Sequence, residues 1–199
     1  MAEGTNQKLA HDYTDAVFVG VGGCGINTIS RLRKAGIMGT RTVFINRFTE
    51  GPLAKGGDVV NFTLNGAKYA PCNYRVPISV EERAEAERRI REVLKDAKKV
   101  LLFAGLGGFT GTAIAPVVAA AAKAEGALLG VVLTFPFKLE KKRVEAADKA
   151  LPGLSGLADD FLLRKNDDLV DRFPNMLLSK AFDLCDMELA EEIKKGGRR

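Results

Sequence analysis

The chain has 199 residues, 46% of them hydrophobic, and a formal net charge of +5 at pH 7. This length predicts one sizeable domain with a true hydrophobic core. The sequence contains no apolar run of about 18 residues and no signal-peptide core in its polar N-terminus, so we expect a cytoplasmic protein without a membrane span.

The reactive and basic residues exclude further classes of protein. The chain has 3 cysteines, 1 histidine and no C-x-x-C motif, which argues against a disulfide framework and against a zinc site, so no metal-ligating residue is predicted. Basic residues gather near the C-terminus without interleaved aromatic residues. This pattern predicts a solvated tail and no specific nucleic-acid partner.

Strands and helices alternate along the chain. Continuous Val-, Leu- and Phe-rich runs are typical of strands buried on both faces, and they occur at Ala16–Val19, Thr42–Ile45, Val59–Phe62, Val100–Ala104, Leu128–Thr134 and Asp160–Leu163. Apolar residues at helical spacing predict helices at Ile26–Ala35, Val80–Lys98, Ala113–Glu125, Leu139–Leu151 and Met176–Lys195. This alternation predicts an α/β fold of three layers, with a mostly parallel sheet and helices on both faces.

Local signals refine two of these helices. Ser79, with Glu82 three residues later, predicts a capping box at one helix start. Pro116 is expected in the first turn of its helix, where its missing N–H matters least. Two segments read as loops, at Gly51–Lys55 and Gly66–Pro77.

Two glycine runs follow predicted strands and precede predicted helices. The more informative run combines four glycines with two threonine hydroxyls, and it reads Gly105-Leu106-Gly107-Gly108-Phe109-Thr110-Gly111-Thr112. Glycines allow close backbone approach, and a following helix N-terminus offers free N–H groups, so this run predicts a cradle for phosphate oxygens. The other run reads Gly20-Val21-Gly22-Gly23-Cys24-Gly25. Together they predict a nucleotide held from two sides.

The order of motifs resembles that of the tubulin/FtsZ family over residues 17–186. The run from Ala104 to Ala119 is similar to the family's signature loop and its helix, and the earlier glycine run with Asn27 is similar to the first phosphate loop. Thr134-Phe135-Pro136-Phe137 with Glu140 and Arg143 resembles the ribose-side loop, and Asn166-Asp167 resembles a base-holding pair. Ala181, Phe182 and Asp186 resemble the start of the central helix.

The resemblance implies a site for GTP or GDP, with Mg held mainly through phosphates and water. The residues that it assigns to the nucleotide are Gly22, Gly23, Cys24, Asn27, Asn46, Gly107, Gly108, Phe109, Thr110, Gly111, Thr112, Pro136, Glu140, Arg143, Asn166, Phe182 and Asp186. It also implies a cytoskeletal protein of cell division or cell shape. Head-to-tail self-association, or association with a full-length FtsZ/tubulin-like partner, is implied in the same way.

The sequence departs from the family pattern in its loops. Phe109 stands where the family has a glycine, which puts a bulky side chain beside the phosphates. The loop after the second strand reads Asn46-Arg47-Phe48-Thr49-Glu50 and lacks the family's acidic residue near the metal. Residues 66–71 lack the Gly-rich pattern of the terminal-phosphate sensor. These departures predict a nucleotide site that is weaker, that favours a diphosphate, or whose nucleotide does not switch the protein.

The C-terminus bears on catalysis. We expect a polar extension at residues 1–14, a GTP-binding domain at 15–195 and a basic tail at 196–199. In the family, acidic residues after the central helix complete the neighbouring subunit's site, and the chain ends before such a stretch. We therefore assign no catalytic residue. The acidic cluster Asp167, Asp168 and Asp171 is expected outside helices and near the base.

Two alternatives stay open on the sequence. Gly20, Gly22 and Gly25 have the G-x-G-x-x-G spacing of a dinucleotide-binding oxidoreductase. An NAD-dependent enzyme of this kind usually has an acidic residue after the second strand, which binds the ribose of NAD. Here the chain has Asn46 and Arg47, which would at best suit NADP. The other alternative is a tubulin-like scaffold that has lost its nucleotide, which Phe109 and Phe48 favour.

Overall fold

The computed structural model describes residues 8–46, 57–61 and 79–196. Strands and helices alternate through most of this part of the chain, as the sequence predicts. The elements are β1 (Val17–Val21), α1 (Gly22–Lys34), β2 (Arg41–Asn46), β3 (Asp58–Asn61), α2 (Val80–Leu94), β4 (Lys99–Gly105), α3 (Phe109–Ala124), β5 (Leu128–Phe135), α4 (Lys141–Leu157), β6 (Asp160–Lys165), α5 (Asn166–Arg172) and α6 (Leu178–Lys195).

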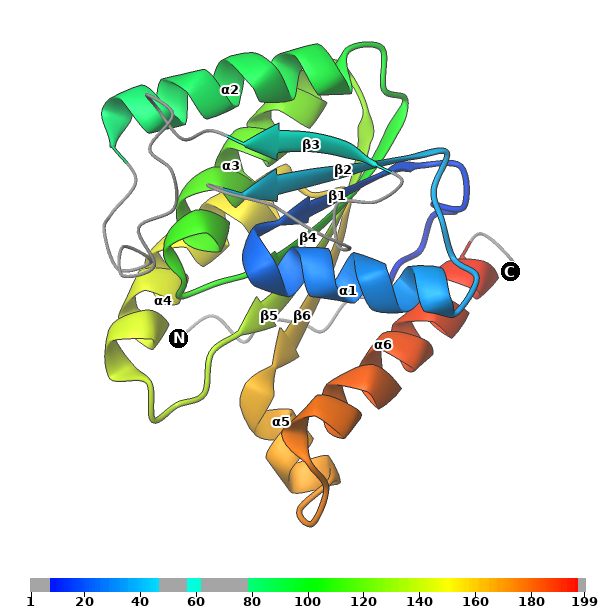
Figure 1. Cartoon of the computed structure of the whole chain (residues 1–199), viewed down its shortest axis with the longest axis vertical. Helices are drawn as coiled ribbons and strands as arrows, with labels where there is room; N and C mark the ends of the chain where they lie inside the picture. The colour runs from blue at the N-terminus through cyan, green and yellow to red at the C-terminus, as the bar shows by residue number, and fades with distance from the viewer. Residues whose placement is uncertain (1–7, 47–56, 62–78, 197–199) are drawn as a thin grey trace.

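The strands form one parallel sheet in the order β3-β2-β1-β4-β5-β6 (Figure 1). The chain builds outward from β1 on one side and from β4 on the other, so the direction of winding reverses between these two central strands. In open parallel sheets, ligands bind beyond the carboxyl ends of the strands at such a reversal. Both glycine runs follow these two strands, which places them together at that point.

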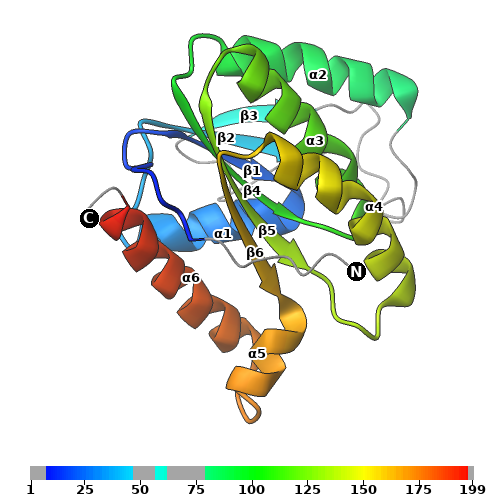
Figure 2. The same ribbon diagram turned by 180° about the vertical axis from the view of Figure 1, so that it is seen from behind.

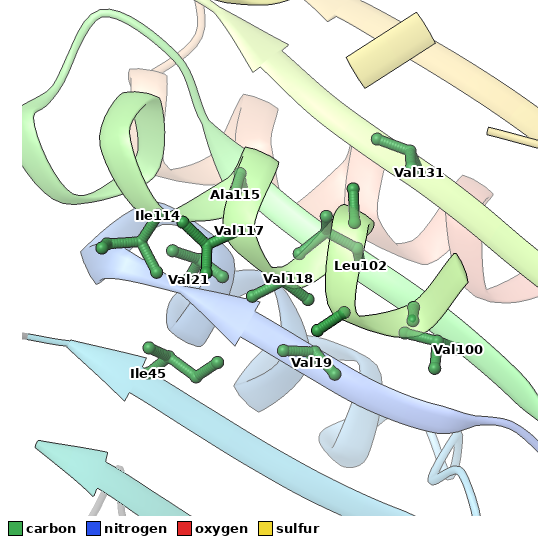
Figure 3. Close-up of a cluster of buried hydrophobic side chains, with 14 of the residues drawn as sticks. Val19, Val21, Ile45, Val100, Leu102, Ile114, Ala115, Val117, Val118 and Val131 are labelled. Carbon is green, nitrogen blue, oxygen red and sulfur yellow. The ribbon is translucent and has the colours of Figure 1, made fainter. Parts of the chain in front are cut away.

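Helices cover both faces of the sheet, which confirms the predicted fold class. Helices α2, α3 and α4 lie on one face, and α1 and α6 lie on the other (Figures 1 and 2). Alternate strand residues point to opposite faces. Val19 and Leu102 therefore pack beneath α3 with Val118 (Figure 3), while Phe18 and Phe103 join the core under α1.

The predicted starts of α1 and α3 are wrong by four residues: the helices begin at Gly22 and Phe109 rather than at Ile26 and Ala113. The physical reason is close packing of each first turn against a neighbouring strand. A Cβ on Gly25 would lie 2.1 Å from the Phe103 carbonyl oxygen, and one on Gly111 would lie 2.0 Å from that of Gly105. These glycines belong to the helices and allow that approach.

Three further expectations need correction. Pro116 lies inside α3, beyond its first turn, because the helix begins earlier than predicted. Helix α2 stops at Leu94, before the predicted Lys98. The acidic residues Asp167, Asp168 and Asp171 belong to the short helix α5. Its seven residues are too few for a clear periodic pattern, but two acidic residues in the first turn complement the helix dipole.

Other parts of the chain bear on the remaining expectations. The capping box of Ser79 and Glu82 is confirmed at the start of α2. Leu9 and Tyr13, from the expected polar extension, are buried in the core under α1 and α6. The two predicted loops at 51–55 and 66–77 lie outside the described residues. Across the part of the chain that the structure describes, no helix is both long enough and apolar enough to cross a bilayer.

Candidate functional site

A cavity of about 990 Å³ opens at the carboxyl ends of the strands, where the direction of winding reverses. Ligand pockets typically measure about 300–1,000 Å³, so this cavity is large enough for a nucleotide. Most residues that the sequence assigned to a nucleotide line it, and these are Gly22, Gly23, Cys24, Asn27, Asn46, Gly108, Phe109, Thr110, Gly111, Pro136, Arg143, Asn166, Phe182 and Asp186.

One end of the cavity is formed by the N-termini of α1 and α3. Their N-cap residues, Val21 and Gly108, make no side-chain capping hydrogen bond. The first-turn N–H groups of a helix have no partner within the helix, and the helix dipole adds partial positive charge there. Two such termini at one end of a cavity make a binding place for an anion with several oxygens.

Two glycines at this end have no neighbour on the side where a Cβ would point. A Cβ on Gly23 or Gly108 would meet no heavy atom within 4 Å among the described residues. Both residues line the cavity, so their missing side chains leave room for a ligand to approach the backbone. This differs from Gly25 and Gly111, whose small size serves helix packing.

The threonines of the signature run have different surroundings. Thr110 donates its hydroxyl hydrogen to Asn46 Oδ1 at 3.4 Å, which joins the start of α3 to the end of β2. Thr112 Oγ1 instead accepts the Gly107 N–H at 2.9 Å, and neither of these two residues lines the cavity. Their assignment to the phosphates therefore has no support from the cavity lining.

Phe109 is the first residue of α3, and its side chain is 41% exposed while lining the cavity. This large side chain therefore borders the space beside the two helix N-termini. The large side chain that the sequence places in this run therefore lies at the cavity border.

The two charged residues that the resemblance assigns to the ribose side form a short ion pair. Arg143 lines the cavity, and its guanidinium lies 2.5 Å from Glu140 Oε1. Glu140 also accepts the Phe137 N–H at 3.1 Å, and it does not line the cavity. Glu140 is therefore committed to its own loop and to Arg143, whereas Pro136 and Arg143 face the open space.

Cys24 lines the cavity in the first turn of α1, beside Gly105. The residue borders open space, yet its thiol sits within the cavity wall, and this desolvation raises its pKa above the ordinary value. A hydrogen bond with Thr134 acts in the opposite direction. A thiol with a raised pKa stays protonated at neutral pH, so the geometry does not favour a nucleophilic role for Cys24.

The opposite end of the cavity combines an aromatic ring with polar groups. Asn166 begins α5, and its Oδ1 is buried without a hydrogen-bond partner among the described residues. Phe182, on α6, is half-buried and packs against Leu169, Ala181 and Cys185. A buried acceptor without a partner is costly, so Asn166 marks a position where a ligand donor would fit.

Asp186 is a buried carboxylate at this end, with only 4% of its surface exposed. Arg164 Nη1 lies 2.8 Å from its Oδ1, and Arg31 Nη1 lies 3.4 Å from its Oδ2. Burial raises the pKa of Asp186, and the charges of both arginines oppose that rise. The arginines come from β6 and α1, so three elements meet at one carboxylate.

The sequence analysis missed both arginines. Arg164 lies at the end of β6, which extends to Lys165 rather than stopping at Leu163. A charged residue at the carboxyl end of an apolar strand, two positions before Asn166, is the signal that would have found it. Arg31 offers no comparable signal, because α1 also carries Arg33 and Lys34 close by.

No group of three or more His, Cys, Asp or Glu side chains with metal-binding arrangement occurs in the described ranges 8–46, 57–61 and 79–196. The donors at the end of the cavity formed by the α1 and α3 N-termini are backbone N–H groups and the polar side chains of Asn27, Asn46 and Thr110. A hard cation such as Mg²⁺ commonly keeps several waters and takes ligands from substrate phosphates. The residues present fit a cation of that kind that arrives together with a phosphate-bearing ligand.

Comparison with protein families matches residues 15–173 to the tubulin/FtsZ family, GTPase domain. Among curated proteins, the chain is 36% identical over 198 residues to cell division protein FtsZ 2 of Methanocaldococcus jannaschii, covering 96% of this chain and 51% of that protein. It is 38% identical over 186 residues to cell division protein FtsZ 2 of Haloferax volcanii, covering 89% of this chain and 45% of that protein.

Solved structures give the same picture. An empty FtsZ dimer from M. jannaschii superposes with a TM-score of 0.72 at 32% identity, covering 94% of this chain and 57% of that one. A CetZ from Methanosaeta thermophila superposes with a TM-score of 0.62 at 19% identity, covering 89% and 52%, and so shares the fold. The chain thus spans about half the length of the curated relatives it matches.

Proposed function

The chain belongs to the tubulin/FtsZ family, and from that premise we propose that its cavity binds GTP or GDP. The observation that carries the proposal is the pairing of two different ends in one cavity. Two helix N-termini without side-chain caps lie at one end, and a buried carboxylate with an unpartnered amide oxygen lies at the other. A nucleotide has the matching anion and the matching hydrogen-bonding base.

The phosphates would lie at the helix N-termini. In this proposal the backbone N–H groups near Gly23 and Gly108 donate to phosphate oxygens, because these residues leave the approach open. The hydroxyl of Thr110 and the amides of Asn27 and Asn46 would supply further contacts. Magnesium would be held mainly by the phosphates and by water. Its positive charge would neutralise part of the negative charge of the phosphates as they bind.

The base would lie beside Asp186. Guanine presents two neighbouring N–H donors, at N1 and N2, which match the two oxygens of a carboxylate, whereas adenine lacks this pair of donors. Asn166 Oδ1 is a further acceptor within the same region. The ring of Phe182 offers a stacking surface, and base–aromatic stacking is worth about 1–3 kcal/mol in comparable sites.

The wider role follows from the relatives. Those named above are cell division proteins, and we propose that this chain is the nucleotide-binding part of a cytoskeletal protein of cell division or cell shape. Its partners would be the guanine nucleotide and either further copies of itself or an FtsZ/tubulin-like protein. A head-to-tail contact of this kind is heterologous and forms open filaments.

One alternative function keeps a specific observation in its favour. Phe109 borders the phosphate end with its side chain 41% exposed, which suits a tubulin-like scaffold that has lost its nucleotide. The oxidoreductase alternative shares the strand order of dinucleotide-binding folds, but the chain's family membership argues against it. We therefore retain the scaffold as the second candidate.

Identification of the bound nucleotide separates these functions. The purified protein is denatured, and the released small molecules are identified by chromatography and mass. We expect GDP or GTP, together with calorimetric binding of GDP that is tighter than that of ADP. Equal binding of ADP and GDP would overturn the guanine assignment, release of NADP would restore the oxidoreductase, and absence of binding to any of them would favour the scaffold.

A further inference from the structure

Arg164 and Arg31 hold the carboxylate of Asp186 from two different elements. Each arginine reaches a different oxygen, Arg164 at 2.8 Å from Oδ1 and Arg31 at 3.4 Å from Oδ2. Arg164 also donates to the carbonyl oxygen of Cys185, the residue before Asp186 on α6. The guanidinium of Arg164 therefore contacts both the side chain of Asp186 and the adjoining backbone.

The arginines leave room for a ligand on the same carboxylate. A carboxylate has about four acceptor positions, two on each oxygen. One arginine contact on each oxygen uses half of them, so each oxygen keeps one acceptor position for the two donors of guanine. Asp186, Arg164 and Arg31 all line the cavity, which puts the clamp and the open acceptors in the same space.

We propose that Arg164, supported by Arg31, is the positioning residue that makes Asp186 a reader of the guanine base. This role rests on the proposed function, and it would make Arg164 a determinant of the preference for guanine over other bases. Without a cation beside it, a carboxylate this deeply buried would favour its neutral form, and a protonated acid accepts poorly and presents a donor to the guanine donors. The fork of Arg164 also fixes the orientation of the carboxylate.

The charges around Asp186 give the arginines this role. Burial is the largest influence on the pKa of Asp186 and raises it, while Arg164 and then Arg31 lower it. Arg31 also pairs with Asp183, at 2.5 Å. Among the described residues, Cys24 on α1 and Cys185 on α6 also interact electrostatically with Asp186, and Cys185 in turn faces Arg172 on α5 and Glu188 on α6.

The test compares Arg164→Met and Arg164→Lys with the parent chain. The measured quantity is the ratio of affinities for GDP and IDP, which lacks the N2 amino group, at pH values from 5.5 to 8.5. In Arg164→Met we expect the ratio to fall by about tenfold at neutral pH, as for loss of a bidentate partner. At high pH the GDP to IDP affinity ratio of this variant should rise part of the way towards that of the parent chain, because Asp186 then ionises. Arg164→Lys should lower the GDP to IDP affinity ratio less than Arg164→Met does, because lysine retains a positive charge beside Asp186.

Controls separate this role from general damage. Arg88→Met removes an exposed arginine on α2 and should leave the ratio unchanged. In an Asp186→Asn background, Arg164→Met should have no further effect on the ratio, because its effect acts through that carboxylate. Arg31→Met provides a second variant should Arg164→Met fail to fold, and it should shift the pH profile in the same direction.

The outcomes are distinct. An unchanged ratio and pH profile in a folded Arg164→Met variant would overturn the proposal while leaving guanine binding intact. Equal losses of GDP and IDP affinity would also overturn it, because Arg164 would then act on something other than the N2 contact. A parent chain that binds neither nucleotide would overturn the proposed function, and the role of Arg164 with it.

Discussion

Residues of the same type have different roles at the cavity, and the glycines are the clearest example: some allow helix packing and others leave space for a ligand. Gly25 and Gly111 are small because a Cβ would collide with a carbonyl oxygen of a neighbouring strand, whereas Gly23 and Gly108 face open space. Substitution of the first pair would disturb packing, and substitution of the second pair would fill the cavity. The two kinds of glycine cannot be told apart by composition.

Gly108→Val is expected to abolish nucleotide binding and keep the fold. The backbone of Gly108 is extended, with φ −92° and ψ 161°, so a β-branched residue adopts it without strain. The new side chain would occupy the space in front of the α3 N-terminus. Calorimetry with GDP and circular dichroism measure the two effects. Gly153→Val, which also points into open space, is the matched control. Unchanged affinity in Gly108→Val would mean that this run is only a turn.

Asp186→Asn is expected to reduce the preference for GDP over ADP. The amide keeps the size of the side chain but replaces one acceptor oxygen with a donor, which faces the guanine donors. Loss of one bidentate partner costs about 1–3 kcal/mol of discrimination. Competition binding gives the GDP to ADP ratio, with the exposed Asp148→Asn as control. An undiminished ratio in Asp186→Asn would remove Asp186 from base recognition.

The role of a helix in this protein depends on its N-terminus as much as on its apolar face. Helices α1 and α3 lack side-chain caps, and their N-termini meet at the cavity. Helix α2 is the opposite case, because Ser79 and Glu82 satisfy its first N–H groups reciprocally. The uncapped helices keep N–H groups available for a ligand, and the capped helix has a structural role.

Ser79→Ala is expected to lower the free energy of unfolding by about 1 kcal/mol, as for other N-cap losses. The Glu82 N–H would lose its acceptor, which lies at 3.1 Å, and the nucleotide affinity should not change because α2 is remote from the cavity. Urea denaturation measures the loss. Ser155→Ala, on an exposed turn of α4, is the control. A stable Ser79→Ala variant would show that tertiary packing alone fixes the start of α2.

At the scale of the whole molecule, acidic groups are unevenly distributed along the cavity. Its carboxylates come from the β6–α5–α6 side, at Asp168, Asp171, Asp186, Glu188 and Glu192. Among the described residues, none of the lining residues from the glycine runs carries a carboxylate. The end formed by the α1 and α3 N-termini is therefore suited to binding an anion, and the described part of the chain supplies no acidic group there to activate water.

We accordingly expect the purified chain to bind nucleotide but to hydrolyse GTP slowly. A positioned general base contributes about 10²–10⁴-fold to such a reaction, and its absence should leave phosphate release near background. If self-association brings no acidic group to this end of the cavity, the specific rate should not rise with protein concentration. A phosphate-release assay over a range of concentrations measures this. A rate that rises with concentration would show that the chain completes its own site on self-association.

The sequence could predict those parts of the fold that depend on local patterns. Continuous apolar runs predicted the six strands found among the described residues, because a strand buried on both faces needs apolar residues along most of its length. The capping box was predicted because its two residues lie three apart. The early starts of α1 and α3 were missed, since glycines that pack a helix against a strand resemble loop glycines. The helix α5 was missed because its seven residues are too few for a clear periodic pattern.

The candidate site divides in the same way. The sequence by itself determined the two glycine runs and the strand–helix alternation, because each is carried by residues close together in the chain. It also determined the family, because each family motif is a short local run and the order of the motifs is read along the chain. Only the tertiary structure decided that Arg31, Arg164 and Asp186 meet, since they come from α1, β6 and α6 and their approach depends on how these elements pack. It also decided that Thr112 and Glu140 turn to protein partners, because a hydroxyl or carboxylate takes the nearest suitable partner.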